Sequence, residues 1–226
     1  MQSWSLLPDI SASMPFQMAL DEVLFNRYQN AQEASLGPML RFYYSDIEWT
    51  SIGRLQKWST NGKAQVCRRM TGGGAVKHGK DLMFSLLAPK QAHPSFRKVS
   101  ESYVKMHEAL QDAFASLNVT TRFYRCNENL PRGGECFKYP IVSDLAWNDQ
   151  KIAGGAQKRS AHALIHQESI QPVKGLCPKA LRRALIQSFE RFFSVTINPV
   201  CWNPDWLAEA ESVCAPVTAE AEEILV

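Results

Sequence analysis

Cys136 lies in a glycine-containing segment with one basic residue on each side, Arg132 and Lys138. Nearby cations stabilise a thiolate, which is the nucleophilic form of a cysteine. Most cysteines, however, are small residues of a hydrophobic core. The segment alone therefore leaves two interpretations open, a nucleophile and a packing residue.

Lys151 begins a run of mostly small residues that continues through Gly154 and Ala156 to Gln157. A lysine followed by small residues at a hairpin can present its ammonium across a cleft. A lone lysine is more often a solvated surface charge. The residue types by themselves do not decide between these two interpretations.

Three adjacent glycines, Gly72, Gly73 and Gly74, lie between two predicted strands and follow Arg68 and Arg69. Glycines leave backbone N–H groups open to a ligand, and arginines bind anions or polarise carbonyls. The alternative is a flexible, basic hairpin loop. No Gly-Lys-Ser/Thr ends the segment, and residue 77 is not glycine, so neither a Walker A loop nor a dinucleotide fingerprint is present.

The periodicity of the apolar residues predicts the elements that position these segments. We expect helices over about 15–28 and 96–117, a third opening at Pro178 and a fourth opening at Asn203-Pro204. Short runs predict strands at 39–44, 49–52, 65–68, 83–87, 119–124, 142–147 and 162–166. Asn148 to Gln150 predicts a hairpin turn within 145–157. The expected fold is α+β, a mixed or antiparallel sheet with helices on one side.

Composition excludes several classes of protein. Of 226 residues, 45% are apolar and 21% charged, which is ordinary globular usage and excludes a disordered or fibrous chain. A net charge of +3 is too weak to predict a nucleic-acid partner. No apolar run reaches the roughly 20 residues of a membrane helix, and the N-terminus lacks the features of a secretory signal. We therefore expect a cytoplasmic protein with no membrane partner.

The cysteines and histidines do not predict a metal. None of the six cysteines forms C-x-x-C with another, which argues against zinc and against a redox dithiol. His166 and Glu168 have the H-x-E spacing of a zinc deaminase, but no Pro-Cys-x-x-Cys follows them.

Taken together, the motifs resemble the superfamily of lipoate-protein ligases, octanoyltransferases and biotin protein ligases. Met18 to Glu22 resembles that superfamily's first helix, and Leu40 to Gln56 its next strands and Gly-Arg-x-Gln turn. Arg68 to His78 is similar to its glycine loop, and Lys151 to Gln157 to its lysine motif. The resemblance covers about residues 1–195, followed by a tail over 196–226 that we expect to be helical.

The resemblance implies a single catalytic domain over 1–226, with a largely antiparallel mixed sheet flanked by helices, like that of biotin ligases. It implies a cytoplasmic monomer that places an octanoyl or lipoyl group on a lysine of a lipoyl domain. Such domains occur in the glycine cleavage H protein and in the E2 subunit of 2-oxoacid dehydrogenases. Carried over by motif, substrate binding falls on Arg69, Thr71, Gly72, Gly73, Gly74, Ala75, His78, Gly154 and Ala156.

Two mechanisms occur in the superfamily. A ligase activates a free acid with ATP and Mg as an acyl-adenylate, whereas a transferase takes octanoyl from acyl-carrier protein and needs no cofactor. Glu135 to Phe137 resembles the segment of cysteine-dependent octanoyltransferases, so we expect Cys136 and Lys151 to be catalytic and metal to be absent. An ATP-dependent ligase forming lipoyl-AMP and a non-catalytic acyl- or carrier-binding homologue are the alternatives.

Four positions depart from the superfamily pattern. Gln167 and Glu168 stand where His-Gly is usual, Gly155 stands where serine is common, and Gly79 stands where aspartate is common. If the strand carrying Glu168 lines the acyl pocket, the carboxylate disfavours a fatty chain unless its side chain points away.

Overall fold

The computed structural model describes residues 2–29, 37–57, 65–124, 135–138 and 141–214. In chain order its elements are β1 (Gln2–Ala12), α1 (Met14–Gln29), β2 (Met39–Ser45), β3 (Trp49–Ile52), β4 (Val66–Arg68), β5 (Val76–His78), β6 (Leu82–Pro89), η1 (Lys90–Ala92), η2 (Pro94–Phe96), α2 (Val99–Ser116), β7 (Arg122–Phe123), β8 (Leu145–Trp147), β9 (Gln150–Arg159), β10 (Ala163–Ile170), α3 (Pro178–Phe193), β11 (Val195–Pro199) and α4 (Pro204–Val213).

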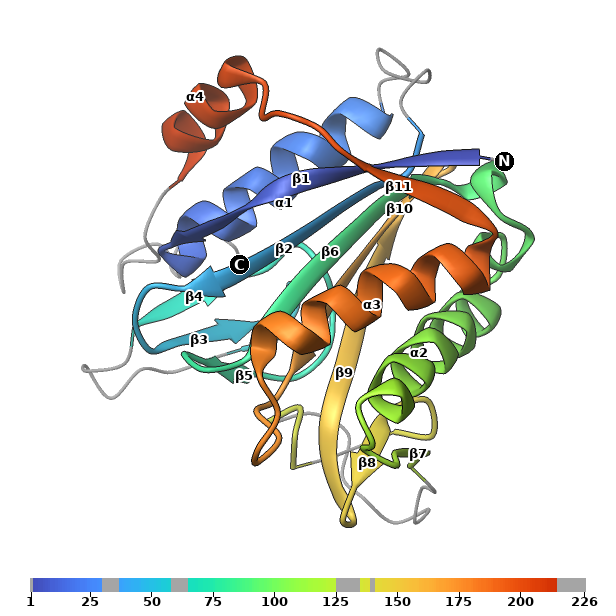
Figure 1. The fold of residues 1–226 in the computed structure, drawn as a ribbon. Coiled ribbons are helices and arrows are strands. Elements are labelled where there is room, and N and C mark those ends of the chain that lie inside the picture. Colours follow the sequence, from blue (N-terminus) through green and yellow to red (C-terminus); the bar gives the residue numbers. More distant parts are fainter. Residues whose placement is uncertain (1, 30–36, 58–64, 125–134, 139–140, 215–226) are drawn as a thin grey trace.

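The main sheet has the strand order β11-β1-β2-β6-β10-β9-β8-β7 (Figure 1). β1 pairs in parallel with β11 and with β2, and every other pair in this sheet is antiparallel. A second sheet has the order β4-β3-β5. The expectation of a mixed, largely antiparallel sheet is confirmed.

Helices cover both faces of the main sheet, which corrects the expectation of helices on one side. In Figure 1, α2 and α3 lie side by side across one face, and α1 lies beside α4. Alternate residues along β10 explain this arrangement, because Leu164 belongs to the hydrophobic cluster formed with α2 and α3, whereas Ile165 belongs to the cluster formed with α1. A strand with apolar residues on both sides needs a helix on each.

The predicted helix starts agree with the structure except at α2. Pro94–Phe96 forms a separate 3-10 turn, so α2 begins at Val99 rather than at Phe96. Asn203 caps α4 by accepting a hydrogen bond from the Asp205 amide. The tail expected to be helical from residue 196 instead begins with β11, whose Val195 and Ile197 are buried against the sheet. Residues 215–226 of that tail lie outside the described residues.

The glycine segment is not a hairpin loop, because β4 and β5 do not pair with each other. Both pair with β3, so residues 69–75 cross over the end of that strand. The crossing is tight, since a Cβ on Gly53 would overlap the carbonyl oxygen of Gly73. Gly73 has φ +87°, a backbone conformation that glycine adopts without strain.

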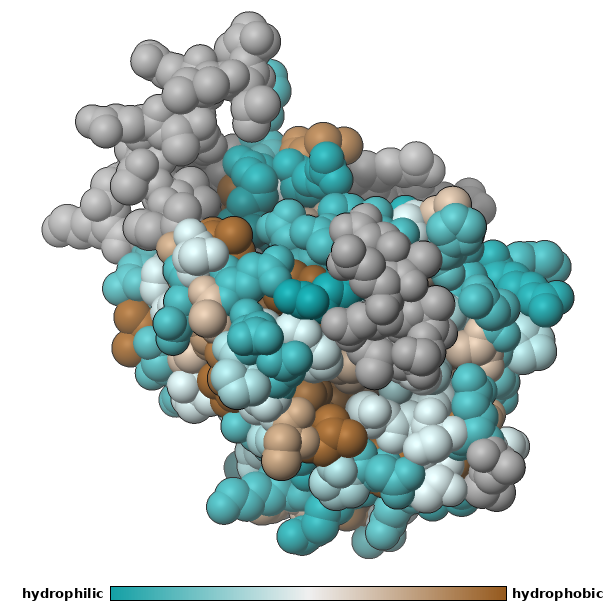
Figure 2. All heavy atoms as spheres, turned by 90° about the horizontal axis from the view of Figure 1, so that it is seen from above, coloured by the Kyte–Doolittle hydropathy of each residue, from teal (hydrophilic) through white to brown (hydrophobic). Residues whose placement is uncertain are grey.

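Neither the face shown in Figure 2 nor the helices have the character of a membrane-spanning helical protein in the part of the chain that the structure describes. The face in Figure 2 is mainly hydrophilic, with small, separate hydrophobic patches. Among the described residues, no helix combines the length and apolar character that crossing a bilayer requires.

Candidate functional site

The Cys136 thiol and the Lys151 ammonium meet at the end of the glycine segment. The Nζ of Lys151 lies 3.1 Å from the Cys136 Sγ and 3.2 Å from the Cys136 carbonyl oxygen. The Cys136 amide donates to the Ala75 carbonyl at 2.7 Å, which fixes the cysteine segment against the glycine segment. The two residues expected to be catalytic are thus brought together, with Cys136 half-buried and Lys151 buried.

A β-bulge and a glycine bring Lys151 to this position. The pairing register between β8 and β9 shifts between Leu145 and Ala146, which inserts an extra residue in β9. Bulges of this kind re-aim side chains next to functional sites. The lysine then folds back over Gly154, where a Cβ would overlap its Cε and Nζ atoms.

Asp144 holds the lysine in place. Its Oδ2 lies 2.8 Å from the Lys151 Nζ and accepts the Ile141 amide at 2.7 Å. Burial acts to lower the pKa of Lys151, but the Cys136 sulfur and the Asp144 carboxylate outweigh it, so the pKa is raised. Lys151 is therefore an ammonium at neutral pH, and it can stabilise a neighbouring anion.

A pocket opens beside Cys136 between the two sheets. Its apolar lining includes Met14, Met18, Tyr43, Val76, Met83 and Ala156. The pocket also receives Ser51, His78 and Ser169. A flexible methionine lining adapts well to an alkyl chain. The thiol therefore lies at the edge of a cavity that suits an apolar group.

Arg69 braces the glycine segment from within. Its guanidinium donates to the Gly72 and Gly74 carbonyls, each at 2.7 Å, and to the Ser51 carbonyl at 3.1 Å. These hydrogen bonds fix the direction of the backbone across the end of β3. Arg69, which we expected to bind substrate, lines the pocket, but its guanidinium donates these hydrogen bonds to the protein backbone.

His78, on β5, lines the pocket, whereas Thr71 lies in the glycine segment beside Gln167. His78 is hydrogen-bonded to Asp81 through Nδ1 and to Ser51 through Nε2, both at 2.7 Å. Thr71 donates to the Gln167 Oε1 at 2.6 Å. Both expected substrate-binding side chains are thus held by partners within the protein.

Sequence reasoning missed Asp144, Ser51 and Gln167 as members of the site. An acidic residue just ahead of the predicted hairpin was a usable signal for a partner of Lys151. Gln167 carried a signal only as a departure from the superfamily pattern. Ser51 carried none, because its place depends on how the small sheet packs on the main sheet.

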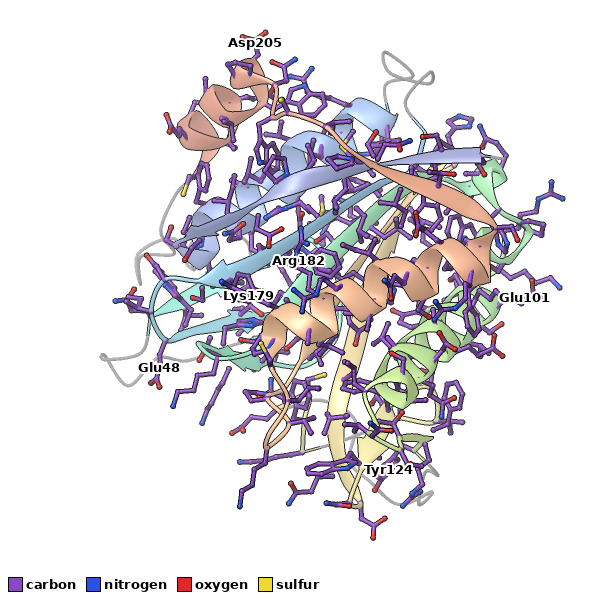
Figure 3. The ribbon with its side chains drawn as sticks, viewed as in Figure 1. Glu48, Glu101, Tyr124, Lys179, Arg182 and Asp205 are labelled. Carbon is purple, nitrogen blue, oxygen red and sulfur yellow. The ribbon has the colours of Figure 1, made fainter. Side chains whose placement is uncertain are left out.

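A second, open cavity lies on the other side of Lys151. Its lining includes Lys77, Phe137, Trp147 and Tyr124, the last of which is labelled in Figure 3 near β7 and β8. The Lys151 Nζ also lies 5.1 Å from the centre of the Phe137 ring, within cation–π range. The cysteine and lysine thus lie between a narrow apolar pocket and a wider opening to solvent.

Comparison with known proteins places this geometry in a family. Residues 13–171, which include the glycine segment, Cys136 and the lysine segment, match the lipoyl protein ligase A/B catalytic domain. The chain belongs to this family. The fold and the motif resemblance are thereby confirmed.

Relatives and solved structures agree with that assignment. The chain is 31% identical over 185 residues to octanoyltransferase LipM of Bacillus cereus and to that of Staphylococcus aureus. The alignments cover 75% of this chain but only 65% and 66% of those relatives. A lipoate-protein ligase A bound with ATP has a TM-score of 0.74 at 20% identity, covering 95% of this chain and 94% of that one. A bipartite lipoate protein ligase of Thermoplasma acidophilum has a TM-score of 0.71 at 18% sequence identity. That match covers 95% of this chain and 92% of that one.

Proposed function

We propose that this family member transfers an octanoyl or lipoyl group to a lysine of a lipoyl domain through a thioester on Cys136. The single observation that carries the proposal is the Lys151 ammonium 3.1 Å from a cysteine sulfur at the edge of a methionine-lined pocket. The relatives named octanoyltransferase LipM support the same chemistry.

In the first step, the Cys136 thiolate attacks the carbonyl carbon of an octanoyl thioester on acyl-carrier protein. A new C–S bond to Cys136 forms, the C–S bond to the carrier breaks, and the carrier leaves as a thiolate that takes up a proton. One thioester replaces another, so the exchange is nearly neutral in free energy and needs no ATP.

In the second step, the neutral amine of a lipoyl-domain lysine attacks the Cys136 thioester. The C–N bond of an amide forms while the C–S bond breaks. The proton of the attacking amine passes to the departing Cys136 sulfur or to water. An amide is more stable than a thioester, and this difference drives the transfer forward.

Lys151 acts in both steps as a fixed positive charge rather than as a base. Its raised pKa keeps the ammonium protonated at neutral pH. In that state it stabilises the thiolate before attack and when the thiolate is released. Asp144 orients the ammonium and does not touch the reacting atoms.

The glycine segment and the start of β9 form the proposed acyl site. Backbone N–H groups of Gly72, Gly73 and Gly74 would stabilise the oxyanion that develops on the acyl carbonyl. Ala156 and Gly154 line the pocket proposed for the acyl chain, and Ala75 lines the wider cavity beside it. Arg69, Thr71 and His78 hold the segment in shape. Gly154 has a second task, since it makes room for Lys151.

We place the activity in a single-domain, cytoplasmic monomer, where reducing conditions keep Cys136 free. Acyl-carrier protein is the proposed donor, and an H protein or E2 lipoyl domain the acceptor. The ATP-dependent ligase and the non-catalytic binding protein are the competing hypotheses, and the experiment below separates them.

The test is to incubate the protein with octanoyl-acyl-carrier protein and to record its intact mass. We expect an octanoyl adduct on the wild type and on Cys177→Ala, a matched control at an exposed cysteine. Cys136→Ala should show none. An adduct that requires ATP and free octanoate and survives Cys136→Ala would support the ligase. Absence of any acylation of protein or lipoyl domain would support the binding protein.

A further inference from the structure

Three buried side chains under β10 take no part in the proposed acyl transfer. Glu168 and His166 belong to β10 and His107 to α2, and all three side chains are fully buried. The Glu168 Oε2 lies 3.1 Å from the His107 Nε2 and 2.8 Å from the His166 Nε2. The Glu168 Oε1 is buried without a hydrogen-bond partner among the described residues, so only the two histidines anchor the carboxylate.

Glu168 is among the residues that line the acyl pocket, but its carboxylate extends to the opposite side of the sheet. Gln167 reaches Asp21 on α1, on the pocket side, whereas Glu168 reaches His107 on α2. The hydrogen bonds to the histidines therefore hold the charge on the side of α2. The Glu168 side chain is thus directed away from the proposed acyl chain, as the sequence analysis required. Its buried charge needs another explanation.

Gly155 and Glu168 form a coupled pair. They are directly opposite each other in the β9–β10 ladder. A Cβ on Gly155 would overlap the Glu168 carboxylate and lie 2.5 Å from the His166 Cε1. A side chain at 155 would therefore force the Glu168 carboxylate and the His166 ring to move, which couples positions 155 and 168.

The hydrogen bonds determine where the protons are. Arg159 donates to the Gln157 Oε1 at 2.9 Å, so the Gln157 amide nitrogen must face the His166 Nδ1, at 3.0 Å. The His166 Nδ1 accepts, and its Nε2–H donates to Glu168. A metal ion would need a lone pair on that Nε2, so the arrangement favours a proton network over a metal site.

Both ring nitrogens of His107 face hydrogen-bond acceptors in this network. Its Nδ1 donates to the Ser143 carbonyl, and its Nε2 faces the Glu168 Oε2. Burial alone would raise the pKa of Glu168, but His107 and then His166 outweigh it and lower the pKa to about 2. Burial would lower the pKa of His107, but Glu168 outweighs it and the pKa is raised.

The network leads directly to the proposed catalytic lysine. The carbonyl that His107 holds belongs to Ser143, and the next residue is Asp144, which pairs with Lys151. We propose, building on the function above, that Glu168 and His107 are positioning residues that hold Asp144, and through it Lys151, against Cys136. The Glu168 carboxylate fixes the His107 imidazolium, and the imidazolium fixes the peptide between Ser143 and Asp144. That peptide in turn orients the Asp144 carboxylate.

The Glu168 carboxylate acts on His107 both as a charge and as a hydrogen-bond acceptor. It is first among the groups that raise the pKa of His107, so removing it lowers that pKa and leaves the ring without its acceptor at Nε2. Both histidine Nε2 atoms contact the same oxygen, Oε2. Glu168→Gln with its amide oxygen at that place can accept both hydrogen bonds, so it keeps the anchor of the His107 ring without the charge.

The experiment measures alkylation of Cys136 by iodoacetamide as a function of pH, which does not depend on any acyl donor. We expect Glu168→Ala to slow alkylation at pH 7 by roughly tenfold and to move the midpoint of its pH profile upward. Glu168→Gln should stay near the wild type. Ser188→Ala is the matched control, because it removes a buried hydrogen bond to α2 at Ala109 without touching the network.

Each outcome decides the proposal. A slow Glu168→Ala beside normal Glu168→Gln and Ser188→Ala variants supports it, whether or not octanoyl transfer is found. A folded Glu168→Ala with a wild-type profile overturns it, since a purely structural role would change only the melting temperature. Stoichiometric metal in the purified protein, lost in Glu168→Ala, also overturns it.

A further measurement covers a variant that does not fold. In the wild type, nitrogen NMR of the His107 ring at neutral pH should show both nitrogens protonated. A neutral His107 ring would overturn the proposal without any variant.

Discussion

Lys151 reaches Cys136 because Gly154 has no side chain. The lysine crosses the face of β9 at that glycine, and its Nζ ends 3.1 Å from the Cys136 Sγ. Asp144 also holds this ammonium, with its Oδ2 2.8 Å from the Nζ.

Gly154→Ala should therefore reduce the reactivity of Cys136 without unfolding the protein. The new methyl group would displace the end of a flexible side chain rather than backbone, so we expect the melting temperature to change little. Alkylation of Cys136 at pH 7 should slow by roughly tenfold. A double-mutant cycle with Lys151→Ala provides the control. If Gly154→Ala slows alkylation equally when Lys151 is absent, the effect does not pass through the lysine.

Gly155→Ser should destabilise the protein by about 2 kcal/mol, because the added Cβ overlaps a buried carboxylate. Combining it with Glu168→Gly should recover part of that loss, since each change makes room for the other. Urea unfolding of the two single variants and the double variant measures the coupling. Strictly additive free energies would refute the idea that these two positions form one unit.

Acid should destabilise the wild type through Glu168. The pKa of this group is lowered in the folded protein from 4.5 to about 2. A lowered pKa contributes stability that is present above the unfolded value of 4.5 and is lost as the pH falls toward 2. The contribution is on the order of 3 kcal/mol. The free energy of unfolding of Glu168→Gln should lack this part of the slope between those pH values. Parallel curves for wild type and variant would contradict the assignment of the charge.

Arg69→Lys should loosen the glycine segment. A lysine keeps the charge but cannot donate to the Gly72, Gly74 and Ser51 carbonyls together, as the guanidinium does. Loss of these buried hydrogen bonds should cost about 1–3 kcal/mol in the free energy of unfolding. Octanoyl adduct formation should slow as well. A variant with wild-type stability and wild-type adduct formation would show that the guanidinium does not brace this segment.

Local sequence patterns predicted most of the elements near the site. The α1 and α3 helices and the β8–β9 hairpin follow from apolar spacing and turn residues, and Asn148 and Asp149 adopt the positive φ values that a two-residue turn requires. The sequence did not predict β1, because Pro8 interrupts its apolar run. In the structure, the β1–β2 register shifts between Leu7 and Ile10, where the proline is tolerated.

The parts of the site that sequence could not predict depend on distant pairing. His107 and Glu168 are 61 residues apart, and each looks like an ordinary polar residue in its own segment. Thr71 and Gln167 are 96 residues apart and meet only because the small sheet packs on the main sheet. The Cys136 and Lys151 pair was predictable because the two segments carry family motifs, while the Asp144 contact needed the bulge in β9.

The central claim is that a thioester on Cys136 is the intermediate of transfer, and a single-turnover chase tests it most directly. The octanoylated protein is freed of acyl-carrier protein and mixed with a lipoyl domain in the absence of ATP. We predict that octanoyl leaves Cys136 at the same rate at which it appears on the lipoyl-domain lysine. An acyl group that stays on the cysteine while the lipoyl domain remains unmodified would contradict the claim.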